Sequence, residues 1–61
     1  MFKQENLKFI RKAHSASQSK FSELIHCTLR MYQYYESGKK KMPMALLELL
    51  EFKLKEIIDN E

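Results

Sequence analysis

Apolar side chains recur along this chain at intervals of three and four residues, the spacing that places them on one face of a helix. Phe21, Leu24 and Ile25 give the clearest example, at positions i, i+3 and i+4. Polar stretches interrupt the pattern at residues 14–17, 26–28 and 36–43. The pattern therefore predicts four helices, at about residues 4–13, 18–25, 29–35 and 43–58.

The residue types at the breaks agree with these boundaries. Ser17 and Thr28 can each cap the helix that follows, because a hydroxyl oxygen accepts a hydrogen bond from an unpaired amide of the first turn. Gly38 suits the left-handed conformation that often follows a helix, and Pro43 suits the first turn of the last one. One glycine and one proline in 61 residues are too few turn residues for an all-β fold, so an all-α domain is expected.

The last predicted helix carries more apolar residues than one buried face requires. Eight large apolar side chains lie between residues 46 and 58, whereas a helix packed on a small core needs a stripe about 100° wide. One interpretation is that this helix pairs with a second copy of the chain, and the other is a broad core contact within one domain. The expected dimer seam consists of Leu47, Leu50, Leu54, Ile57 and Ile58.

Charge is distributed unevenly along the chain, whose net charge is +3. Residues 1–41 contain nine Lys or Arg against three acidic residues, a net +6, and residues 42–61 contain two against five, a net −3. A basic region in so small a domain indicates a polyanionic partner such as nucleic acid. The same partner would repel the acidic C-terminal part, which is therefore expected to face away.

Other classes of function find little support in the sequence. Cys27 has no second cysteine, and the spacing of His14 and His26 is not that of a metal site, so no metal or cofactor is expected. No carboxylate pair, Cys–His–acid set or glycine-rich phosphate loop indicates an enzyme. No apolar run approaches the ~20 residues of a membrane-spanning helix, and no secretory signal is evident, so a cytoplasmic location is expected.

The segment "QSKFSELIHCTLRMYQYYESGKKKMP", which runs from Gln18 to Pro43, resembles the lambda-repressor-like (Cro/C1, XRE) helix-turn-helix family. The resemblance covers about residues 6–50, and "YYESGKKKMP" is its most specific part. The chain departs from the family pattern at His26 and Ser15, where glycine is common, and at Ala16, where a larger apolar residue is common. It matches the pattern in order and spacing at Leu7, Arg11, Ser17, Gln18, Phe21, Ser22, Ile25, Cys27, Thr28, Tyr32, Tyr35, Glu36, Gly38 and Pro43.

This resemblance implies an all-α, four-helix lambda-repressor-like domain with a longer C-terminal helix. A single DNA-binding domain would span residues 1–61, with the helix-turn-helix unit at 18–36 and the dimer seam in the helix at 43–58. Arg11 and Glu36 would form a structural, partly buried ion pair between the first and third helices, and the alternative is an exposed surface pair. His26 would take the left-handed conformation of the usual glycine, at a strain of about 1 kcal/mol.

The resemblance also implies that the third helix enters the major groove of double-stranded DNA. Arg30 can make two hydrogen bonds to guanine, and Gln33 can make two to adenine. The base-reading positions of the family are held here by Leu29, Arg30, Gln33 and Tyr34. Phosphate contacts are expected from Gln18, Lys20, Thr28, Lys39, Lys40 and Lys41.

The expected function is sequence-specific binding of double-stranded DNA by a transcriptional regulator. The leading interpretation is a Cro-like repressor, or an autoregulator of a phage or mobile-element operon, bound as a homodimer to an inverted repeat. It would act in the cytoplasm of a bacterial or phage-infected cell. The alternative is a small antitoxin or antirepressor-like module that binds a protein partner through the apolar surface of the last helix.

Overall fold

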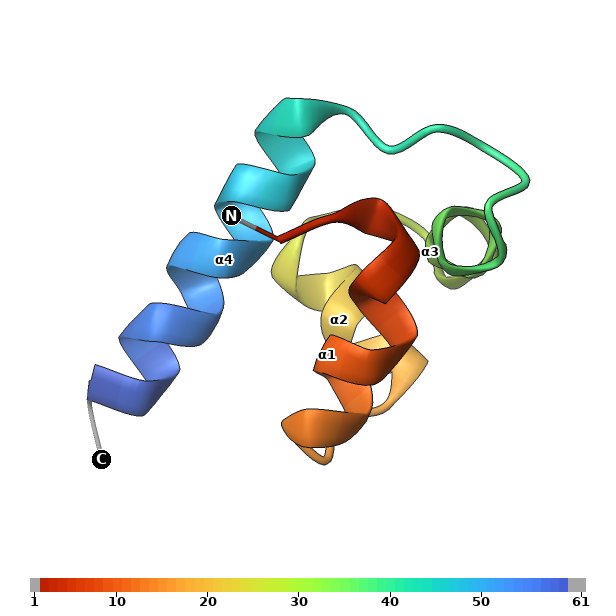
Figure 1. The fold of residues 1–61 in the computed structure, drawn as a ribbon. Helices are drawn as coiled ribbons and strands as arrows, with labels where there is room; N and C mark the ends of the chain where they lie inside the picture. Colours follow the sequence, from red (N-terminus) through yellow and green to blue (C-terminus); the bar gives the residue numbers. More distant parts are fainter. Residues whose placement is uncertain (1, 60–61) are drawn as a thin grey trace.

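The computed structural model describes the backbone of residues 2–59 and the side chains of residues 2–56. Over this range the secondary structure is helical, without strands, which confirms the expected all-α class. A short 3-10 helix, η1 (Gln4–Asn6), precedes the first α-helix. The α-helices of the described chain are α1 (Leu7–Ala13), α2 (Gln18–Leu24), α3 (Leu29–Ser37) and α4 (Met44–Asp59) (Figure 1).

The side chains expected to cap α2 and α3 do so. The Ser17 hydroxyl oxygen accepts a hydrogen bond from the Lys20 amide at 3.0 Å, and the Thr28 hydroxyl oxygen accepts one from the Met31 amide at 3.1 Å. Each bond satisfies an amide in the first turn that has no partner within its own helix. The start of both helices is therefore determined by a local side chain.

The observed helix ends differ from the expected ones by one or two residues. The first expected helix begins with the 3-10 turn, in which the Asn6 amide bonds the Lys3 carbonyl at 2.9 Å. The third helix continues to Ser37, because it ends only where Gly38 takes a left-handed φ of 83°. The fourth begins at Met44, and Pro43 precedes it with a carbonyl that accepts from the amide of Leu46 at 3.0 Å.

In the described part of the chain, two residues other than glycine also have positive φ angles, and at both the sequence departs from the family that it resembles. His26 has a φ of 56° in the connection between α2 and α3, and Ser15 has a φ of 53° in the connection between α1 and α2. The left-handed conformation is strained for residues that carry a Cβ atom. The backbone therefore keeps a geometry that suits glycine, although the sequence has placed other residues there.

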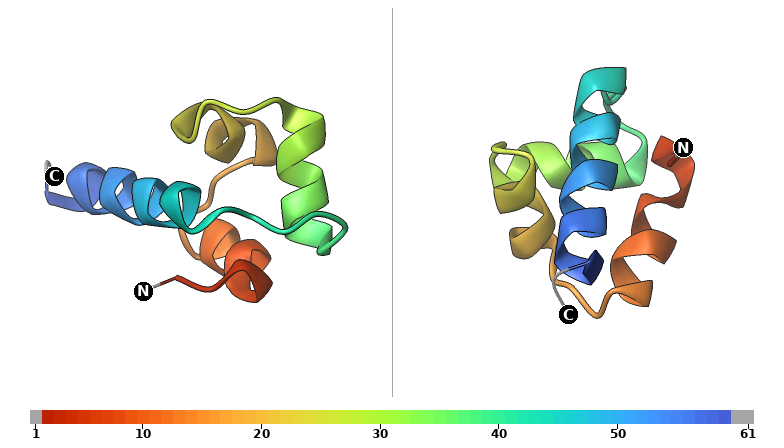
Figure 2. Two further views of the ribbon diagram at one scale, coloured as in Figure 1. Left: turned by 90° about the horizontal axis from the view of Figure 1, so that it is seen from above. Right: turned by 90° about the vertical axis from the view of Figure 1, so that its left-hand side faces the viewer.

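The core lies where α1, α2, α3 and α4 meet. An edge-to-face contact between the rings of Phe21 and Tyr32, with centroids 6.0 Å apart, joins α2 to α3. The helices are arranged so that α3 and the C-terminal half of α4 lie at opposite ends of the molecule (Figures 1 and 2). The buried apolar side chains are Leu7, Phe21, Ile25, Tyr32, Tyr35, Met42, Leu47, Leu50 and Leu54.

This core corrects the expected dimer seam. Leu47, Leu50 and Leu54 are only 6%, 0% and 3% exposed, because they form the face of α4 that packs on the other helices. They belong to the core of one chain and are not available to a second copy. The side chains of Ile57 and Ile58, the other two expected seam residues, lie outside the described residues.

Candidate nucleic-acid interface

Helix α3 is anchored on one side and open to solvent on the other. Tyr32 and Tyr35 are buried and attach the helix to the core. On the opposite side, Leu29, Arg30 and Gln33 are exposed. Three of the expected base-reading residues therefore lie on one accessible face of α3, and the buried tyrosines on the opposite face fix the position of the helix.

Tyr34, the fourth expected base-reading residue, is half-buried and belongs to a different contact. The Lys39 ammonium lies over its ring, 5.1 Å from the centroid. A cation above an aromatic face is attracted by the negative charge density of the ring. Tyr34 thus connects the last turn of α3 to the loop that carries the three consecutive lysines.

An ion pair between Arg11 and Glu36 ties α3 to α1. The Nε and Nη2 atoms of Arg11 donate to the two carboxylate oxygens of Glu36 at 3.0 and 3.1 Å. The Nη1 atom donates to the Ala16 carbonyl at 3.1 Å, so the guanidinium also holds the connection between α1 and α2. The two side chains are 14% and 7% exposed, so the structure has the partly buried form of this pair.

The surroundings of this pair favour its charged form. Burial alone would raise the pKa of Glu36, but the hydrogen bond from Arg11, together with smaller contributions from Tyr32 and Gln18, outweighs burial, so the pKa is lowered. The hydrogen bond to Glu36 raises the pKa of Arg11 despite some burial. Burial, followed by the adjacent Glu36 carboxylate, raises the pKa of Tyr32, whose enclosed hydroxyl has no hydrogen-bond partner of good geometry among the described residues.

A chain of side-chain amides leads from the ion pair to the exposed face of α3. The Nε2 atom of Gln18 donates to Glu36 Oε1 at 3.3 Å, and Gln18 Oε1 accepts from Gln33 Nε2 at 3.1 Å. The first residue of α2 is thereby held against the middle of α3. An expected phosphate contact and an expected base contact are neighbours in the fold.

The remaining expected phosphate contacts are exposed. Lys20 lies in the first turn of α2, and Thr28 stands directly before α3 with its hydroxyl oxygen engaged as the cap. Lys39, Lys40 and Lys41 lie in the loop from α3 to α4. The three loop lysines therefore follow the C-terminal end of α3 directly.

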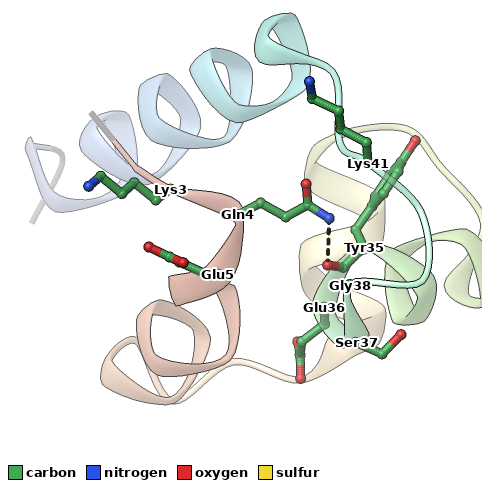
Figure 3. Close-up of a pocket in the computed structure, with 8 residues that line it drawn as sticks. All are labelled: Lys3, Gln4, Glu5, Tyr35, Glu36, Ser37, Gly38 and Lys41. Carbon is green, nitrogen blue, oxygen red and sulfur yellow. Dashed lines mark hydrogen bonds between the residues drawn. The ribbon is translucent and has the colours of Figure 1, made fainter.

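Gln4 is a structural residue that sequence reasoning missed. Its Nε2 atom donates to the carbonyls of Tyr35 at 3.0 Å and Lys40 at 2.6 Å, and its Oε1 atom accepts from the Met42 amide at 2.7 Å. Figure 3 shows the side chain reaching from η1 to the end of α3, inside a surface hollow that Lys3 and Lys41 also line. No sequence pattern signals these bonds, because all three partners are backbone atoms more than 30 positions away.

The described part of the chain has no cluster of three or more His, Cys, Asp or Glu residues that could hold a metal ion. Among its helices, none combines the length and the apolar character needed to cross a bilayer. Cys27 is a half-buried free thiol, and burial raises its pKa. No protein-family model, curated protein or solved structure matches this chain.

Proposed function

We propose that this protein is a sequence-specific DNA-binding regulator of the lambda-repressor-like helix-turn-helix type, and that it reads DNA with α3. The observation that carries this proposal is the two-sided character of α3. Tyr32 and Tyr35 hold the helix from the core side, while Arg30 and Gln33 are exposed on the other. A helix used for recognition must be both fixed in position and accessible, because its side chains have to meet base edges in a set geometry.

The chemistry of the exposed face suits the major groove, which is wide enough to admit a helix. The Arg30 guanidinium can donate two parallel hydrogen bonds to O6 and N7 of guanine. Gln33 uses one of its two amide hydrogens on Gln18, which leaves one hydrogen and the carbonyl oxygen. Those two groups are what a glutamine needs to pair with N7 and N6 of adenine.

The surrounding charges suit the DNA backbone. Lys39, Lys40 and Lys41 follow α3 directly and can neutralise phosphates next to the groove that the helix occupies. Gln18 and Lys20 offer further contacts at the start of α2. The C-terminal half of α4 lies at the far end of the molecule (Figure 2), and its two lysines balance its two acidic residues, so it adds little repulsion at this face.

We also propose that the DNA-bound form is a homodimer, with a seam different from the one expected from the sequence. Outside the core-facing stripe, α4 carries Ala45, Leu49 and Phe52 at the four- and three-residue spacing of a helix–helix seam. Leu49 is half-buried at the edge of the core, and Phe52 is 60% exposed. A two-fold pair of such chains can present two α3 helices to half-sites one turn apart, about 34 Å, on an inverted repeat. Occupying a promoter in this way would repress transcription.

The selection of bound sequences from random duplex DNA tests this proposal. The wild-type protein is expected to enrich a two-fold symmetric site, and Arg30→Ala is expected to weaken binding to it by about 1–3 kcal/mol and to lose the preference for guanine at one position of each half-site. Lys8→Ala, an exposed change on α1 that also removes one positive charge, serves as the matched control. If Arg30→Ala selects the same site with the same affinity, α3 does not read DNA in the proposed way.

A protein-binding module, such as a small antitoxin or an antirepressor-like protein, is the second candidate. The observation in its favour is the exposure of large apolar side chains, namely Phe9 on α1 and both Met44 and Phe52 on α4. Exposed apolar side chains of this size are common at protein-binding surfaces. This candidate would gain support if the purified protein ignored duplex DNA at low ionic strength.

A further inference from the structure

The loop from α3 to α4 carries the three lysines. The backbone of its residues 40–42 is hydrogen-bonded by a side chain from another part of the chain. The first residues of the loop bond back to α3, through the amides of Gly38 to Tyr35 and of Lys39 and Lys40 to Tyr34. Beyond that point, Gln4 is the one side chain in the described structure that hydrogen-bonds the backbone of residues 40–42. The buried side chain of Met42 is the other anchor of this stretch.

The three bonds use the full donor capacity of one side-chain amide. The Nε2 atom of Gln4 has two hydrogens, and it directs one to the carbonyl of Tyr35 and the other to that of Lys40. The oxygen accepts from the amide of Met42. Among uncharged side chains, only glutamine and asparagine offer two donors and an acceptor on one planar group. The three hydrogen bonds therefore require the amide group of Gln4, and a side chain of the same size without an amide could not make them.

The bonds at Lys40 and Met42 bracket the backbone of Lys41, and the bond at Tyr35 connects the same amide to the end of α3. From this geometry we infer that Gln4 is a positioning residue for the phosphate-binding loop, which holds Lys40 and Lys41 in a fixed place relative to α3. This inference rests on the proposed function. A loop that is ordered before it meets DNA has less conformational freedom to lose on binding, so its lysines contribute more to affinity.

The test is a double-mutant cycle between Gln4 and the two lysines. Gln4→Met keeps the length of the side chain and removes its hydrogen bonds, and it is made both in the wild type and in the variant Lys40→Ala/Lys41→Ala. Asn6→Ala is the matched control, because Asn6 is an exposed amide directly after Glu5 in the same short helix and makes no side-chain cap bond. The measurements are the affinity for a duplex at several salt concentrations and the hydrogen exchange of the Met42 amide in the free protein.

Gln4→Met is expected to weaken duplex binding about threefold to tenfold in the wild-type background and to leave binding nearly unchanged once both lysines are alanine. It should also reduce the salt dependence of binding and speed the exchange of the Met42 amide. Equal losses in the two backgrounds would show a general structural effect and would overturn the inference, as would wild-type affinity in Gln4→Met.

One further variant keeps the outcome interpretable if Gln4→Met is unfolded at the temperature of the assay. Gln4→Asn keeps the amide but shortens its reach by one methylene, so the amide no longer reaches the loop backbone. The same coupling to the two lysines is therefore expected for this variant. Failure of the proposed function gives a different result from failure of this inference. In the first case the wild type and every variant ignore duplex DNA alike, whereas in the second the wild type binds and Gln4→Met binds equally well.

Discussion

The carboxylate of Glu36, on α3, accepts hydrogen bonds from side chains on two other helices, Arg11 of α1 and Gln18 of α2. A single charged group thereby joins three helices of a chain too short to build a large core. Because both members of the ion pair are mostly enclosed, the loss of one strands the charge of the other. The ionised carboxylate of Glu36 therefore helps to hold α3 against α1 and α2.

Replacement of this carboxylate is expected to destabilise the fold and to change how stability depends on pH. Glu36→Gln should cost about 3–5 kcal/mol at neutral pH, since Arg11 then lacks its counter-charge. The pKa of Glu36 is lower in the folded protein than its usual value of 4.5. Its contribution is thus complete above pH 4.5 and is lost as the pH falls through the lower folded pKa.

Urea unfolding of the wild type and Glu36→Gln at a series of pH values measures both effects. The wild type should lose stability on acidification below pH 4.5, and Glu36→Gln should lack this component of the loss. The exposed Glu5→Gln change serves as the control and should lose stability on acidification as the wild type does. An equal acid response in wild type and Glu36→Gln would show that the ion pair contributes little in solution.

His26 stores backbone strain at the turn between α2 and α3. Its φ of 56° suits glycine, which has no Cβ atom to clash. His26→Gly is therefore expected to raise the free energy of unfolding by up to about 1 kcal/mol, while His26→Val should lower it, because a β-branched residue tolerates this region least. Thermal unfolding followed by circular dichroism distinguishes the two; a loss of stability in His26→Gly would contradict this interpretation.

Among the elements, the loop from α3 to α4 is the one whose role depends on charge. Lys40→Ala/Lys41→Ala should weaken binding to all duplexes by a similar factor and reduce the slope of log K against log salt by about 0.9 for each phosphate that is no longer neutralised. The charge-matched control Lys53→Ala/Lys55→Ala removes two positive charges from α4. If both double variants change the salt slope equally, the loop does not bind phosphates locally.

Several features of the elements were predictable because their causes are local. A hydroxyl before a helix, as at Ser17 and Thr28, and a left-handed residue after one, as at Gly38, act over three or four positions. The bonds of Gln4 were not predictable, because they join a side chain to backbone atoms that only the folded chain brings near. The hydrogen bond between Gln18 and Gln33 depends in the same way on how α2 crosses α3.

The orientation of α4 is the main point at which the sequence misleads. Apolar residues surround this helix on most sides, so their spacing could not show which stripe meets the core. The structure turns Leu47, Leu50 and Leu54 inward and leaves Phe52 outside. The choice between these stripes depends on the shape of the surface formed by the other helices, which no periodicity within α4 encodes.

For the molecule as a whole, the proposed pairing through α4 predicts that the dimer depends on the side chain of Phe52. Light scattering at tens of micromolar is expected to report a dimer for the wild type and a monomer for Phe52→Ser, because the substitution removes the largest exposed apolar group of the proposed seam. Phe9→Ser, which removes an equally large exposed ring from α1, should remain dimeric. A monomeric wild type, or a dimer lost only in Phe9→Ser, would contradict the seam.

A basic face around α3 lies at one end of the molecule, and the C-terminal half of α4, whose two lysines balance its two acidic residues, lies toward the other (Figure 2). Titration of the isotopically labelled protein with duplex DNA at low ionic strength, followed by backbone amide chemical shifts, tests directly whether the basic end binds. The largest shifts are expected at Leu29, Arg30, Gln33 and the lysine loop, with little change along α4. Shifts confined to α4, or none at all, would contradict DNA recognition by α3.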